Sequence, residues 1–184
     1  MQILHNSTTT ALWHDIIHEA EDQCDIHLKE DLESYLVFLM IRYTTKPHII
    51  NQIVATEFLT GIGLKFTERH QLLQAVGDKC LIYTGLFPKI AEKRLVQLSY
   101  FVKLGQSSYA NISKTHNDLY GGLAKQFVSL MDVLQALRQY SNKYPDLLPL
   151  EAYELWNDTG SQRSLKILKQ YTEALPLFLN KSQK

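Results

Sequence analysis

Apolar residues recur at intervals of three and four along most of this chain, and that spacing constrains its fold more than any other feature. It is the repeat of an α-helix that buries one side, and the strict alternation of a half-buried β-strand is absent. The clearest case is a seam in which successive residues are four, three, four and three positions apart: Leu123, Phe127, Leu130, Leu134 and Leu137. The sequence therefore predicts an all-α fold.

Glycine and proline mark the breaks between the predicted helices. Pro47 ends one stretch, Gly85 stands where a left-handed cap belongs, and Gly160 precedes Ser161, a favourable N-cap. The predicted helices are 9–25, 29–45, 48–60, 67–84, 88–113 (as one helix or two that meet near Arg94), 117–141, 149–157 and 161–175. We expect one domain, residues 1–184, built as a bundle of seven or eight helices with the last two as an appendage.

Composition excludes several functional classes. Hydrophobic residues make up 45% of the chain and charged residues 21%, values near those of globular domains. Nineteen basic residues balance nineteen acidic ones, whereas nucleic-acid-binding proteins usually carry a basic excess. The longest uninterrupted apolar run, Tyr35–Ile41, is far shorter than the roughly 20 residues of a membrane span. We expect neither nucleic acid nor a membrane as a partner.

The ends of the chain and its thiols suggest a location. Residues 1–33 carry a net charge of −7 and residues 161–184 a net charge of +4, so the ends should attract each other unless these are ordinary solvated surface charges. The N-terminal stretch MQILHNSTTT lacks the charged block followed by an apolar block of a signal peptide. The two cysteines are too few for a disulfide framework, and each lies within apolar helical spacing, where a free thiol behaves as a small hydrophobe. We expect a cytoplasmic protein.

Residues 11–27 combine three histidines, one cysteine and five acids, which raises the question of a metal site. On a helical wheel Cys24 belongs to the apolar face, whereas His14 and His18 lie on another flank. A straight helix therefore cannot direct the thiol and both imidazoles to one ion. What remains is a zinc site formed by this pair with Glu21 as a third ligand. Solvated surface histidines are the alternative, and because no distal ligand is identifiable we expect no metal.

Two glycines lie inside predicted helices, where glycine costs about 1 kcal/mol relative to alanine. Gly77 lies on the same helical face as residues of the kind that are usually buried. Gly105, in the stretch FVKLGQSSYANIS, likewise needs a reason for its place within a helix. The natural interpretation is that each glycine admits a neighbouring helix. The alternative is a ligand or cofactor pocket near Gly77, Asp78, Gly105 and Tyr109, although the sequence implies no particular cofactor.

The stretch 29–45 is apolar nearly all round. Such a helix is either central to the core, which we expect, or packs its second face on a partner subunit. Glu33 and Arg42 near its ends, together with Asp78, are candidates for buried charge. The helix that contains residues 98–113 adds aromatic residues of the kind that favour interfaces. The candidate interaction residues on these two helices are Val37, Phe38, Ile41, Tyr100 and Phe101.

Three stretches resemble a family of bacterial helical proteins of similar length that has no assigned activity. They are LESYLVFLMIRYT (32–44), VGDKCLIYTGLFP (76–88) and LSYFVKLGQSSYANIS (98–113). The resemblance implies a bacterial cytoplasmic protein, but it transfers no catalytic residue.

The sequence shows no phosphate-binding loop, no G-x-G-x-x-G, no G-x-S-x-G elbow and no paired C-x-x-C. We therefore expect a non-enzymatic helical interaction or scaffold protein that acts as a homodimer or on another protein. The alternative is a small cofactor- or metal-binding helical enzyme with its pocket near Gly77 and Gly105.

Overall fold

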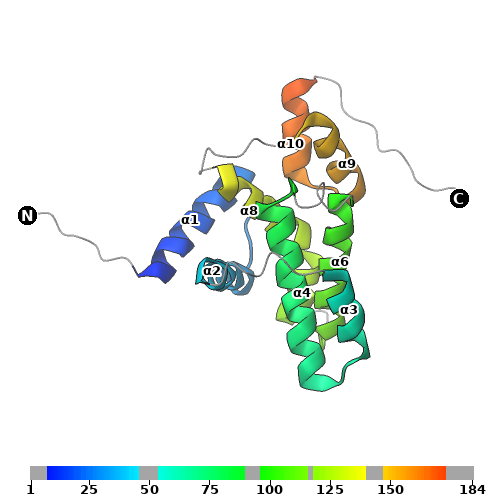
Figure 1. The fold of residues 1–184 in the computed structure, drawn as a ribbon. Coiled ribbons are helices and arrows are strands. Elements are labelled where there is room, and N and C mark those ends of the chain that lie inside the picture. Colours follow the sequence, from blue (N-terminus) through cyan, green and yellow to red (C-terminus); the bar gives the residue numbers. More distant parts are fainter. Residues whose placement is uncertain (1–7, 46–53, 90–95, 116–117, 140–146, 173–184) are drawn as a thin grey trace, which may run out of the picture.

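The computed structural model describes residues 8–45, 54–89, 96–115, 118–139 and 147–172 (Figure 1). In these residues it contains nine helices and no strand, which confirms the all-α prediction. None of these helices is both long enough and apolar enough to cross a bilayer. The helices are α1 (Thr9–Cys24), α2 (Glu30–Thr45), α3 (Val54–Gly63), α4 (Phe66–Leu86), α6 (Leu98–Ile112), α7 (Leu119–Lys125), α8 (Phe127–Gln139), α9 (Pro149–Thr159) and α10 (Gln162–Tyr171).

Helix α4 lies at the centre of the bundle, where it packs against α3, α6 and α8. Every residue from Val76 to Leu86 is buried, so this half of the helix has no solvent-facing side. Helix α2 buries one broad face but exposes Phe38, so the central position expected for residues 29–45 belongs to α4 instead. The predicted end of α4 at Gly85 is also wrong. That glycine has no left-handed conformation, and α4 continues through it to Leu86. Its missing side chain allows close packing instead, since a Cβ there would stand 2.5 Å from the Cβ of Leu134 on α8.

The predicted helix 117–141 is divided between α7 and α8. The backbone leaves helical geometry at Gln126 (φ −99°, ψ 17°), although its N–H still donates to the carbonyl of Gly122. The apolar seam continues through this bend: Leu123, Phe127, Leu130 and Leu134 are fully buried. The proposed break near Arg94 falls outside the described residues.

The last two described helices, α9 and α10, form a hairpin at one end of the molecule (Figure 1). Gly160 ends α9 in a left-handed conformation (φ 75°), and Ser161 caps α10 by accepting the N–H of Ser164, as predicted. The hairpin is joined to the body by polar contacts. The Ser161 hydroxyl donates to the buried carboxylate of Asp132 on α8 at 2.6 Å, and Ser99 on α6 donates to Asp158 at 2.8 Å.

Candidate functional site

The two helical glycines lie where α4 and α6 pack together, which confirms that they admit neighbouring side chains. A Cβ on Gly77 would stand 2.5 Å from Cε1 of Tyr109, a residue of α6. A Cβ on Gly105 would stand 2.4 Å from Cε2 of Phe127 and 2.9 Å from the Cβ of Cys80. Aromatic rings of this chain therefore occupy the space that the alternative hypothesis assigned to a ligand at these two positions.

Next to the first glycine, Asp78 forms the centre of a buried polar cluster. Its Oδ1 accepts hydrogen bonds from the hydroxyls of Tyr35 at 2.5 Å and Tyr109 at 2.8 Å. Its Oδ2 accepts one from Nη1 of Arg42 at 2.7 Å. Gln74 donates in turn to the Tyr35 hydroxyl at 3.3 Å. The cluster joins α2, α4 and α6 through one carboxylate.

The electrostatics of this cluster keep its tyrosines protonated. Burial raises the pKa of the Asp78 carboxyl, and hydrogen bonds from Tyr35 and Tyr109 and the charge of Arg42 oppose that rise. Burial, followed by the charge of Asp78, raises the pKa of both tyrosines, so they remain hydrogen-bond donors. Because both carboxylate oxygens already accept strong hydrogen bonds, Asp78 suits a structural role better than that of a general base.

A cavity of about 210 Å³ lies beside this cluster, between α2 and α4. Its walls are Leu39, Arg42, Gln71, Gln74, Ala75, Asp78, Lys79 and Ile82. The ammonium of Lys79 contacts both carboxylate oxygens of Glu57 on α3, at 2.9 and 2.7 Å. This volume is below the roughly 300–1,000 Å³ of sites for drug-sized ligands. It would fit a small polar molecule.

The predicted interaction residues divide between core and surface. Val37 and Phe101 are buried within the subunit, where a partner could not reach them. Phe38 and Tyr100 are exposed, and Ile41 is half-buried.

A more exposed apolar group lies where α3 meets α4, at the lower end of the molecule in Figure 1. Leu59 is 72% exposed, Phe66 is 90% exposed, and Ile62 lies between them in sequence. We call these three residues the α3–α4 tip. Sequence reasoning missed the tip, although the stretch LTGIGLKF carried a signal in its alternation of apolar residues and glycines.

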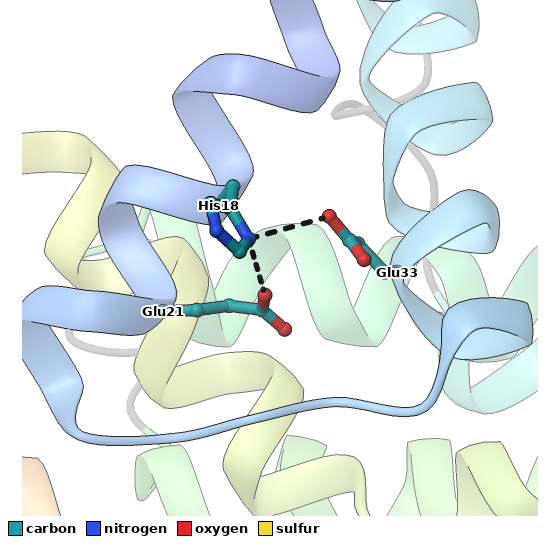
Figure 2. Close-up of side chains that lie close together, drawn as sticks. All are labelled: His18, Glu21 and Glu33. Atoms are coloured by element: carbon teal, nitrogen blue, oxygen red, sulfur yellow. Dashed lines mark ion pairs between the residues drawn. The ribbon is translucent and has the colours of Figure 1, made fainter.

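The histidine-rich flank of α1 faces α2 (Figure 2). His18 Nδ1 lies 3.6 Å from Glu21 Oε2 and 3.9 Å from Glu33 Oε1, and His14 Nε2 lies 3.2 Å from the same Glu33 oxygen. Glu33 is thus the distal residue that the sequence could not identify, because it lies on a different helix. Burial raises the pKa of Glu21, while a hydrogen bond from the backbone N–H of Leu28 opposes the shift.

No protein-family model, curated protein or solved structure matches this chain. The function of the chain must therefore be inferred from the geometry described above, and its resemblance to an uncharacterised bacterial family stays an expectation.

Proposed function

We propose that this chain is a non-enzymatic helical protein that works through protein contacts, as a homodimer joined at the α3–α4 tip. The observation that supports this most directly is the exposure of Leu59 and Phe66 close together in the sequence. A single exposed apolar side chain needs no explanation, but three within eight residues, across the turn that joins α3 to α4, are typical of a contact site.

The backbone at the tip adds a second argument. Phe66 adopts a left-handed conformation (φ 44°), which is unfavourable for a bulky side chain. The fold therefore accepts backbone strain and an exposed ring at the same residue. Burial of the ring in an interface would contribute about 1.5–3 kcal/mol per copy, and this would offset the strain.

The charged residues beside the α3–α4 tip favour a second copy of the chain as its partner. Lys65 and Glu68 flank the exposed ring and are themselves exposed. In a two-fold contact the same patch meets itself, so the lysine of one copy can face the glutamate of the other. The formal net charge of zero leaves no overall repulsion between copies. A cytoplasmic location agrees with two free thiols, Cys24 and Cys80.

Size-exclusion chromatography with light scattering tests the proposal. At high micromolar concentration the wild-type chain should have twice the subunit mass of 21.2 kDa. The double variant Leu59→Lys/Phe66→Asn should be a monomer, with a dimer dissociation constant at least about 100-fold weaker. Asparagine tolerates the left-handed backbone, so the variant should keep its fold. Leu150→Lys, at another exposed leucine, is the matched control and should stay dimeric. A monomeric wild type, or a dimeric double variant, would refute the proposal.

The cavity between α2 and α4 supports a second candidate function, the binding of a small polar molecule. Arg42, Gln71 and Gln74 bring hydrogen-bonding groups to its walls. Ala75→Leu would fill the cavity without removing any of these groups. Mass spectrometry of small molecules released from denatured protein should find a ligand in the wild type and none in this variant, and finding none in either would count against this candidate.

A further inference from the structure

The side chains between α1 and α2 match the donor set and spacing of a transition-metal site. His18, Glu21 and Glu33 each offer one ligand atom, and these atoms lie within 4.8 Å of one another. Figure 2 shows the three side chains converging from the two helices. A tetrahedral zinc ion with bonds of about 2.0–2.2 Å holds its ligand atoms roughly 3.3–3.6 Å apart. The separation of 3.6 Å between His18 and Glu21 meets this range, and that of 3.9 Å between His18 and Glu33 needs a shift of a few tenths of an ångström. The two carboxylates, which lie within 4.8 Å of each other, must move closer together when the ion binds.

The Glu33 carboxylate is the group that most needs a cation. Its Oε1 is buried and accepts no hydrogen bond within the part of the chain that the structure describes. The side chains of Glu33 and Glu21 are only 14% and 4% exposed. Two carboxylates that converge with so little access to water repel each other and lose hydration. A dication between them would remove both penalties and would be neutralised by their two charges.

The surroundings orient the ligands as in known metal sites, where outer hydrogen bonds fix the inner groups. The backbone N–H of Leu28 donates to Glu21 Oε1 at 2.9 Å, which leaves Oε2 on the side of His18. The chain reaches this position because Asp25 ends α1 in a left-handed conformation (φ 55°). His14, one turn before His18, stacks its ring nearly parallel at 6.3 Å and stands beside Glu33. It lies outside the group of three convergent ligand atoms, so it borders the site without belonging to it.

We propose that His18, Glu21 and Glu33 bind a zinc ion that ties α1 to α2, with water as the fourth ligand. Imidazole nitrogens with carboxylate oxygens are donors that zinc accepts, whereas calcium and magnesium select oxygen alone. The exposed edges of both histidines leave a path for the ion from solvent. This site is separate from the α3–α4 tip, so zinc binding does not depend on dimer formation.

Calorimetric titration of the full chain with zinc chloride, after treatment with a chelator and its removal, tests the site. The wild type should bind one zinc ion per chain, and saturating zinc should raise its melting temperature. Glu33→Gln and His18→Gln should each weaken binding at least about 100-fold and abolish the thermal shift, since loss of an outer-shell group alone costs 10–100-fold. Both variants keep the size of the side chain.

Two controls separate the cluster from scattered surface groups. Glu19→Gln and His27→Gln alter an exposed acid and an exposed histidine near the cluster but outside it, and both should bind zinc as the wild type does. Absence of binding by the wild type would overturn the proposal and leave an ion-paired cluster of histidines and glutamates. Unchanged affinity in Glu33→Gln would overturn it as well, as would calcium binding as tight as that of zinc.

Discussion

Replacing Gly77 with alanine adds one methyl group at the tightest point of the α4–α6 contact. The new Cβ would lie 2.5 Å from Cε1 of Tyr109 and 2.8 Å from its Cδ1 and Cζ, closer than packed carbon atoms approach. The ring has little freedom to move away, because it is fully buried and its hydroxyl donates to Asp78. The substitution must therefore displace a ring that is enclosed by its neighbours and also fixed by the hydrogen bond of its hydroxyl.

Three contributions set the size of the effect. Overpacking a core site costs about 1–3 kcal/mol, and weakening a hydrogen bond to a carboxylate costs about 1.5–3 kcal/mol. Alanine is the better helix former by about 1 kcal/mol, which offsets part of this. We expect the free energy of unfolding to fall by about 2–4 kcal/mol. For a chain of this length that corresponds to a melting temperature lower by roughly 5–15 °C.

Thermal unfolding followed by circular dichroism measures the change, and Gly63→Ala is the matched control. Gly63 also lies in a helix, but a Cβ there would have no neighbour within 4 Å in the described structure. The control should be neutral or slightly more stable, since only the helix preference changes. If Gly77→Ala melts at or above the wild-type temperature, close packing against Tyr109 does not restrict this position to glycine.

Two further predictions concern buried carboxylates. Tyr35→Phe removes a donor to Asp78 and should lower the free energy of unfolding, measured by urea titration, by about 1.5–3 kcal/mol. The control Tyr100→Phe, at an exposed ring, should change it by less than about 0.5 kcal/mol. Equal effects of the two substitutions would contradict a stabilising role for the Asp78 cluster. Burial raises the pKa of Asp132 to about 6, while the unfolded chain loses this proton near pH 4, so the folded state binds more protons between these values. The free energy of unfolding should therefore fall as pH rises from about 4 to about 6. Asp132→Asn should remove that part of the pH dependence. If the free energy of unfolding of this variant and of the wild type changes equally with pH, another group is responsible.

The histidine-bearing helix shows what the sequence could and could not predict about the candidate zinc site. Helical periodicity placed His14, His18 and Glu21 on one flank, and the structure agrees. It could not supply Glu33, because periodicity relates residues within one helix and says nothing of which neighbouring helix faces it. The turn that brings Leu28 to the Glu21 carboxylate is equally a product of tertiary structure.

The same limit applies to the core. Apolar spacing predicted that residues 29–45 form a helix, but an apolar surface alone does not determine which helix becomes enclosed. Helix α4 carries polar residues within its buried half and is central nonetheless, because Asp78 finds donors on α2 and α6 and Lys79 finds Glu57 on α3. These pairings join residues that are far apart in the sequence, so no local sequence pattern predicts them.

The contact between Asp132 and Ser161 limits how far this chain can be shortened. A fragment that stops before residue 147 would lose the hydroxyl and the Arg163 N–H that face this carboxylate, and it would uncover the apolar surface on which α9 and α10 rest. The α9–α10 hairpin lies at one end of the molecule, but its contact with Asp132 on α8 makes it part of the fold and not a separable module. A search for a minimal folding fragment should therefore retain both helices.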